Sequence, residues 1–189
     1  MSASNRVVRL CSARRAFTLV ELLIVVIIIG ILAAVAIPQF GDSATDAKKS
    51  SLDADLTVLR GAIELYYHQH GSTYPGIVAK HKVGAADPAA HASVGDAFAK
   101  QLACYSDASG NTADTRDTTN YPYGPYVRRG IPKNPLPAAG ALATADAVTV
   151  VAGADGAGPL TADAAPATGW KFSSVTGQVI ANHGDYDDR

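Results

Sequence analysis

The chain has 189 residues, of which 48% are hydrophobic, and a formal net charge of −1. That length leaves room for one globular domain of ordinary size beside a membrane segment, and it excludes a second large domain. The first 16 residues hold four arginines and no acid, so residues 17–189 carry 12 Lys and Arg against 17 Asp and Glu, a net charge of −5. An acidic domain lacks the positive charge that neutralises phosphates, so we expect no nucleic-acid partner.

An apolar run follows this basic stretch directly. Residues 17–37 contain Thr18 and Glu21 as their only polar side chains, and the run matches the ~20 residues that a helix needs to cross a bilayer core. The sequence therefore predicts a transmembrane helix, with the arginines before it on the cytoplasmic side. A carboxylate at mid-bilayer costs about 2.5 to 3.5 kcal/mol, so Glu21 needs a partner or a place near the headgroups. We interpret it as functional; the alternative is that it snorkels to the membrane surface.

An ordinary secretory signal is a second interpretation of the apolar run. Ala34 and Ala36 fit the small-x-small pattern of a cleavage site, and cutting there would release a soluble protein that begins at Ile37. The carboxylate at Glu21, the length of the run and the helical pattern beyond Pro38 favour the membrane helix instead.

Residues 38–71 have the pattern of an amphipathic helix. Apolar side chains recur every three to four residues, at Leu52, Leu56, Leu59, Ile63 and Tyr66 or Tyr67. This spacing places them on one face. Gly71 supplies a left-handed cap, so we expect one helix from Phe17 to about His70. Gly30 and Pro38 lie inside that helix and weaken it, which predicts a kink or a break there.

Residues 72–189 form the predicted head. We expect a loop over 76–94, a helix over 94–105 with Phe98, Leu102 and Tyr105 facing the core, and an exposed loop over 106–120. The β-branched residues at 147–152 predict a strand. Residues 169–172 and 178–181 predict a hairpin with Trp170 in its core. Together these elements predict an α+β fold, in which a long N-terminal helix packs on a small antiparallel sheet.

The sequence RRAFTLVELLIVVIIIGILAAVAIP at residues 14–38 resembles the N-terminus of type IV pilins and type II secretion pseudopilins, and the match extends over residues 14–40. The resemblance implies that residues 1–16 are a leader, that a prepilin peptidase cuts between Ala16 and Phe17, and that the new Phe17 amine is methylated. Most family members have Gly where Ala16 stands, so we expect slower or equal processing.

The family likeness also implies that Glu21 serves filament assembly. Glu21 lies about one helical turn beyond Phe17, so its carboxylate could face the free amine of a neighbouring subunit in a stack of staggered helices. The family implies that the stretch between Gly30 and Pro38 unwinds when a subunit moves from the bilayer into the filament. The implied partners are like subunits, the prepilin peptidase, the inner-membrane assembly machinery and membrane lipid. The implied location is the bacterial inner membrane, spanned once, with the head in the periplasm or outside.

Parts of the head resemble pseudopilins as well: YGPY at 123–126, IPKNPL at 131–136, and residues 169–180. Cleavage at Ala16 would remove Cys11 and leave Cys104 without a disulfide partner. Motility pilus subunits often close their C-terminal region with a disulfide, which this chain could not form. Both points therefore favour a type II secretion pseudopilin that supports protein export. A type IV pilus subunit for adhesion, motility or DNA uptake remains an alternative, as does an anchored or secreted binding module that does not polymerise.

Catalysis and cofactors have little support in the sequence. The five histidines lack the spacing of a zinc site, and neither a nucleophile elbow nor a phosphate-binding loop is present. We interpret Cys104 as a small buried residue on a helix, not as a reactive thiol. Carboxylates that could bind calcium occur at Asp155, Asp163, Asp185, Asp187 and Asp188. A solvated acidic surface is the favoured reading of these residues, so we expect no cofactor, with calcium as the alternative.

Overall fold

The computed structural model describes residues 17–76, 80–82, 89–153 and 157–189, and the side chains of these ranges except 35–42 and 80–82. The predicted leader, residues 1–16, and the residue Ala16 therefore lie outside the described part. The chain divides into two compact units, Met1–Ala44 and Thr45–Arg189.

The long helix α1 spans Leu19–Gln69, as predicted. Its predicted left-handed cap is present, because Gly71 has φ +61° and the N–H of Ser72 donates to the carbonyl of Tyr67 over 3.0 Å. Within the described residues, no helical stretch meets the length and apolarity that crossing a membrane requires. The predicted span 17–37 ends among residues 35–37, whose side chains lie outside the described part.

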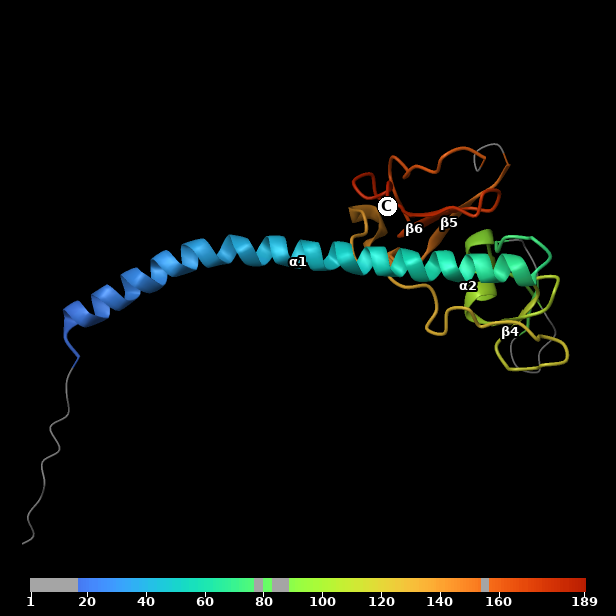
Figure 1. Ribbon diagram of the computed structural model, residues 1–189, viewed down its shortest axis with the longest axis horizontal. Coiled ribbons are helices and arrows are strands. Elements are labelled where there is room, and N and C mark those ends of the chain that lie inside the picture. Colours follow the sequence, from blue (N-terminus) through green and yellow to red (C-terminus); the bar gives the residue numbers. More distant parts are fainter. Residues whose placement is uncertain (1–16, 77–79, 83–88, 154–156) are drawn as a thin grey trace, which may run out of the picture. The chain divides into compact units, whose positions relative to one another are not determined.

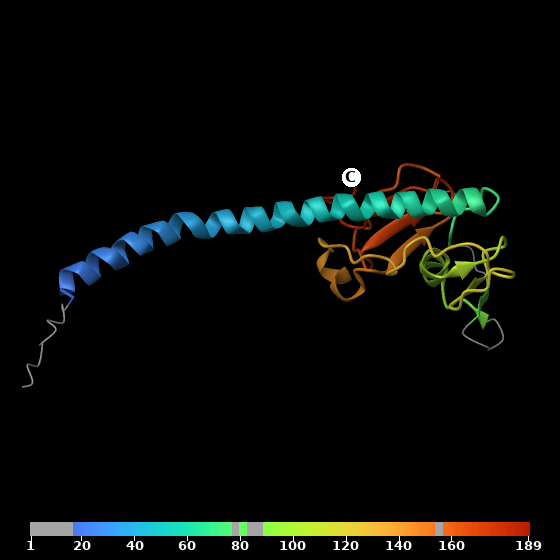
Figure 2. The same ribbon diagram turned by 60° about the horizontal axis from the view of Figure 1, so that its bottom comes forward.

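The part of α1 that belongs to the second unit supplies one side of the core. Leu52, Leu56, Leu59, Ile63 and Tyr66 are each 1% exposed or less, which confirms the predicted face and selects Tyr66 over its neighbour. They pack against a set of buried side chains from the rest of the head: Phe98, Leu102, Val127, Val148, Trp170, Phe172, Val179 and Ala181. Figures 1 and 2 show β5 and β6 lying against this half of α1. The α+β fold predicted from the sequence is confirmed.

The sheet of this core has the strand order β5-β6-β7. Its strands are β5 (Val148–Val151), β6 (Trp170–Ser173) and β7 (Val179–Ala181). The hairpin of β6 and β7 is antiparallel, as predicted. However, β5 pairs in parallel with β6, so the expectation of a purely antiparallel sheet is wrong. Eighteen residues or so separate these two strands, which is enough chain for the crossover that a parallel pair requires.

Trp170 is fully buried in the hairpin, as predicted. Its indole N–H donates to the carbonyl of Pro132 over 2.8 Å, so the polar tip of the ring is satisfied. Between Pro132 and β5 the chain makes a short 3₁₀ helix, η1 (Ala139–Thr144).

A second sheet has the order β2-β1-β4-β3. Its strands are β1 (Lys80–Lys82), β2 (Ala89–Ala90), β3 (Tyr105–Ser106) and β4 (Thr112–Ala113). The prediction of a loop over 76–94 and of an exposed loop over 106–120 is therefore wrong in part, and both residues of β4 are buried. Strands of two or three residues are too short to show alternation, so their pattern does not identify them.

The helix α2 spans Val94–Ala103 and is capped by Ser93, whose Oγ accepts from the N–H of Asp96. Phe98 and Leu102 are fully buried, as predicted. The helix ends two residues before the predicted end, because the chain turns extended at Cys104 and enters β3.

Cys104 is therefore not the buried helical residue that we expected. It is only partly buried, and its Sγ lies 3.6 Å from Oδ1 of Asp114. Burial raises the pKa of its thiol to about 11, which keeps the sulfur protonated and unreactive near neutral pH.

Candidate assembly site at the start of the long helix

The first turn of α1 is closed by two side chains, Thr18 and Glu21. The backbone N–H and the hydroxyl of Thr18 both donate to Oε2 of Glu21, each over 2.9 Å. In return, the N–H of Glu21 donates to Oγ1 of Thr18 over 3.2 Å. This reciprocal arrangement is a capping box, which satisfies backbone donors that the helix start would otherwise leave open. It fixes the Glu21 carboxylate at the beginning of the helix.

Thr18 was noted in the sequence only as a polar residue, and its role as the cap was missed. The signal was present, because Thr-x-x-Glu before an apolar run is the pattern of a capping box. The structure thus adds Thr18 to the predicted site residues Phe17 and Glu21: Phe17 and Thr18 directly precede α1, and Glu21 lies in its first turn.

The surroundings of this site are apolar and open. Phe17 is 86% exposed and Leu19 is 81% exposed, and the apolar side chains that follow up to Leu32 are all about half exposed or more. Apolar surface of this extent needs lipid or other helices to cover it.

The two predicted flexibility residues lie further along α1. Nothing lies within 4 Å of the position that a Cβ on Gly30 would take, so this residue is free of packing constraints. The backbone of α1 stays helical through Pro38, and the predicted break at that residue is absent. The side chain of Pro38 lies outside the described part.

Comparison with known proteins identifies this N-terminal segment. The family model of the prokaryotic N-terminal methylation motif matches residues 11–37, a range that contains the capped helix start. The chain is 26% identical over 125 residues to the type II secretion system core protein G of Klebsiella pneumoniae, which covers 65% of this chain and 69% of that protein.

Two pilus proteins are also similar. The type IV narrow pilus major component PilA5 of Thermus thermophilus is 46% identical over 48 residues, 25% of this chain and 41% of that protein. A fimbrial protein of Pseudomonas aeruginosa is 46% identical over 52 residues, 28% of this chain and 34% of that protein. The matches to these two pilus proteins therefore span less than half of their length. No solved structure matches the chain significantly.

The N-terminal methylation motif and these similarities support the family of type IV pilins and type II secretion pseudopilins.

Two of the predicted calcium candidates, Asp163 and Asp187, are engaged with protein groups. Oδ1 of Asp163 lies 2.6 Å from Nζ of Lys171, and its Oδ2 accepts from the side-chain amide of Asn182 over 2.9 Å. Oδ2 of Asp187 accepts from the N–H of Ala162 over 2.8 Å. Among the described residues no three His, Cys, Asp or Glu side chains group together as metal ligands. The predicted candidate Asp155 lies outside them.

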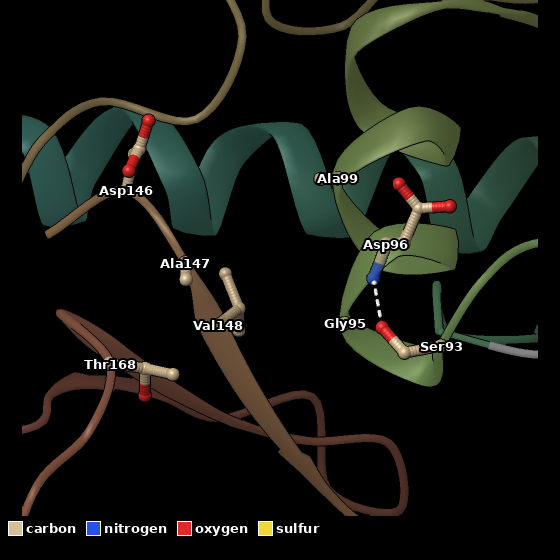
Figure 3. A pocket seen from close by; sticks show the side chains of 8 residues that line it. All are labelled: Ser93, Gly95, Asp96, Ala99, Asp146, Ala147, Val148 and Thr168. Carbon is tan, nitrogen blue, oxygen red and sulfur yellow. Dashed lines mark hydrogen bonds between the residues drawn. The ribbon is translucent and has the colours of Figure 1, made fainter. Parts of the chain in front are cut away.

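A hollow of ≈ 380 Å³ lies in the head between the start of α2 and the start of β5 (Figure 3). It is lined by eight residues: Ser93, Gly95, Asp96, Ala99, Asp146, Ala147, Val148 and Thr168. Figure 3 shows the hydrogen bond from the N–H of Asp96 to Ser93, which caps α2. A Cβ on Gly95 would lie 2.5 Å from the carbonyl oxygen of Val148, so glycine permits the close contact of helix and strand. Capping of α2 and its close contact with β5 thus account for Ser93, Gly95 and Asp96 at this hollow.

Proposed function

We propose that this chain is a structural, non-enzymatic subunit of a type II secretion pseudopilus, and that it assembles through its N-terminal helix to support protein export. The observation that carries this proposal is the extent of the similarities. Similarity to the secretion protein G of Klebsiella pneumoniae extends over 125 residues. The similarity to the two pilus proteins extends over 48 and 52 residues. Only the first of these is long enough to reach well beyond α1 into the head.

The N-terminal segment supports a defined path of maturation. We propose that a prepilin peptidase cuts between Ala16 and Phe17 and that the new Phe17 amine is methylated. Before assembly the apolar part of α1 would anchor the chain in the bacterial inner membrane as a single span, with the N-terminus in the cytoplasm and the head in the periplasm or outside. The positive charge of the leader supports this orientation.

The capping box supports a role for Glu21 in both states. In the bilayer, the donors of Thr18 offset part of the cost of placing a carboxylate at the helix start. In the filament, the amine of a neighbouring Phe17 would supply a positive partner, and a charge-assisted hydrogen bond is stronger than a neutral one. The exposed apolar side chains around the site would be covered by neighbouring helices.

A type IV pilus subunit is the second candidate. Identity to the pilus proteins reaches 46% over the matched 48 and 52 residues, higher than the 26% shared with the secretion protein over 125 residues. Both kinds of protein match this chain, so this identity favours the family without choosing between its members.

Two measurements test the proposal. Mass analysis of the exported chain should show a methylated Phe17 at the N-terminus, whereas a start at Ile37 would indicate a secretory signal. Glu21→Leu should retain membrane insertion and lose filaments, while the matched control Val20→Leu, an apolar exchange at a neighbouring exposed position, should assemble normally. Normal filament number in Glu21→Leu would overturn the assembly role.

A deletion strain then separates the two candidates. Deletion of the gene should abolish export of proteins into the medium and leave surface motility and DNA uptake intact. Loss of motility or DNA uptake with intact export would favour the type IV pilus.

A further inference from the structure

The end of α1 in the head carries a buried histidine, His70, whose side chain is held on several sides. The residue is 3% exposed. Its ring stacks on Tyr66, with ring centroids 3.7 Å apart and planes 6° apart, and the rings of Tyr123 and Tyr126 lie 5.2 Å and 6.2 Å away. A histidine enclosed by aromatic rings in this way has little access to water.

The hydrogen bonds of His70 define its neutral form. Nδ1 lies 2.9 Å from the carbonyl oxygen of Tyr66, and because a carbonyl can only accept, Nδ1 carries the hydrogen. In the neutral ring Nε2 is then an acceptor. It lies 3.1 Å from Oγ of Ser106, so the Ser106 hydroxyl donates to it.

Ser106 connects His70 to residues 121–126, which we call the tyrosine segment. The N–H of Ser106 donates to the carbonyl of Tyr123 over 3.0 Å, and the N–H of Tyr123 donates to the carbonyl of Ser106 over 3.1 Å. One residue before His70, the Gln69 side chain accepts from the hydroxyl of Tyr126 over 2.7 Å. The end of α1 therefore holds the tyrosine segment through two adjacent side chains, Gln69 directly and His70, the residue after the helix, by way of Ser106.

We propose that His70 is an acid-sensitive latch, which holds the tyrosine segment to the end of α1 while its ring is neutral and releases it when the ring takes up a proton. A proton from solvent would add to the lone pair of Nε2. That nitrogen would then donate to Oγ of Ser106 instead of accepting from it, so the Ser106 hydroxyl would have to turn its hydrogen toward another acceptor, and the new cation would lie between tyrosine rings. A buried cation of this kind is costly, and opening to water relieves the cost.

The groups around His70 come from three places. Tyr66 belongs to α1, Ser106 to β3 with Asp107 directly after it, and the remaining two tyrosines belong to the tyrosine segment. Asp107 is the one ionised group among them, and its charge favours the protonated ring.

The balance of these effects gives the direction of the pH response. Burial lowers the pKa of His70 from its ordinary value of 6.5, although the carbonyl of Tyr66 and the backbone and charge of Asp107 act in the opposite direction. The released ring, which is solvated, binds a proton below about pH 6.5, and the held ring binds it only at a lower pH. The latch is therefore fully closed above pH 6.5 and weakens as the pH falls below that value.

Hydrogen exchange of the full chain in detergent, corrected for intrinsic rates, tests the latch at pH 7.5 and pH 5.0. Linkage predicts that protection of the tyrosine-segment amides falls by up to about 30-fold between these conditions, the limit for a ring that stays neutral while held. His70→Gln should remove this pH dependence. The matched control is His68→Gln, an exposed histidine on the same helical turn, which should retain it.

Titration of the ring signals by NMR gives a second readout in the unmodified chain, so the test holds even if His70→Gln fails to fold. The loss of protection should follow the titration of His70, with a midpoint below 6.5. The proposal is overturned if the ring titrates while protection stays constant. It is also overturned if the loss persists in His70→Gln, a result that would implicate the buried His91.

Discussion

Gly169, the residue before β6, is a position where even substitution by alanine should strongly destabilise the fold. A Cβ there would lie 1.9 Å from the carbonyl oxygen of Ala145 and 2.9 Å from its Cα. Both are backbone atoms, so no side-chain rotation relieves the overlap. Moreover, the carbonyl of Gly169 accepts from the side chain of Asn134 over 2.8 Å and from the N–H of Asn182 over 3.0 Å, while its own N–H donates to Thr144 over 3.1 Å.

Gly169→Ala should therefore lower the free energy of unfolding by about 4 kcal/mol. Overpacking costs about 1 to 3 kcal/mol, and shifting the backbone strains three hydrogen bonds that contribute about 1 kcal/mol each. Such a loss is comparable to the whole stability of a small domain.

Urea unfolding of the fragment Thr45–Arg189, followed by the fluorescence of Trp170, measures this effect, since the chain contains a single tryptophan. Gly184→Ala is the matched control, because nothing lies within 4 Å of a Cβ at that residue, and its effect should stay within about 0.5 kcal/mol. A Gly169→Ala variant within 1 kcal/mol of the wild type, on the scale of an ordinary surface change, would refute the packing argument.

Three further predictions concern separate parts of the chain. The hydroxyl of Tyr66 is buried and has no hydrogen-bond partner in the described part. Tyr66→Phe should therefore increase the free energy of unfolding, measured with urea, by about 1 kcal/mol, whereas Tyr126→Phe should decrease it by a similar amount. Equal effects of the two substitutions would contradict this. Partial burial raises the pKa of Asp163, but hydrogen bonds from Lys171 and an asparagine outweigh it and hold the pKa below the ordinary 3.8. Stability from this pair is thus present above pH 3.8 and lost as the pH falls further, and an acid titration of Lys171→Met should lack that loss. Pro38→Ala should leave membrane insertion intact and change the number or length of filaments seen by electron microscopy, and unchanged filaments would count against the flexibility of this region.

The long helix could be read from the sequence because burial and helical geometry act together along it. Five apolar residues, Leu52, Leu56, Leu59, Ile63 and Tyr66, recur at the helical period over four turns, and each of the five is buried. Trp170 was likewise assigned correctly, because large apolar side chains that alternate along a hairpin lie on one face, and that face is buried in the core. A hydrophobic pattern that extends over several turns still identifies the element when a single residue departs from it.

Short elements escaped the same reasoning. In β3 and β4 the polar residues Ser106 and Thr112 are fully buried, which no hydrophobic pattern indicates. Their position is set by the neighbouring turn, where Oδ1 of Asp107 accepts from the N–H groups of Ser109 and Asn111 over 2.9 Å each. Cys104 was misplaced for the same reason: the chain leaves α2 to enter β3, and that choice depends on contacts far along the sequence.

The late position of β6 and β7 in the chain bears on how the head folds. The apolar face of α1 between Leu52 and Tyr66 is covered by Trp170, Val179 and Ala181, residues more than a hundred positions further along. Contacts between such distant residues form slowly, because the intervening chain must first be closed into a loop. During synthesis part of this face stays uncovered until the final hairpin emerges, and a truncation before β6 removes Trp170, Val179 and Ala181 from its cover. Completion of the hydrophobic core of the head thus depends on β6 and β7, the last strands to be synthesised.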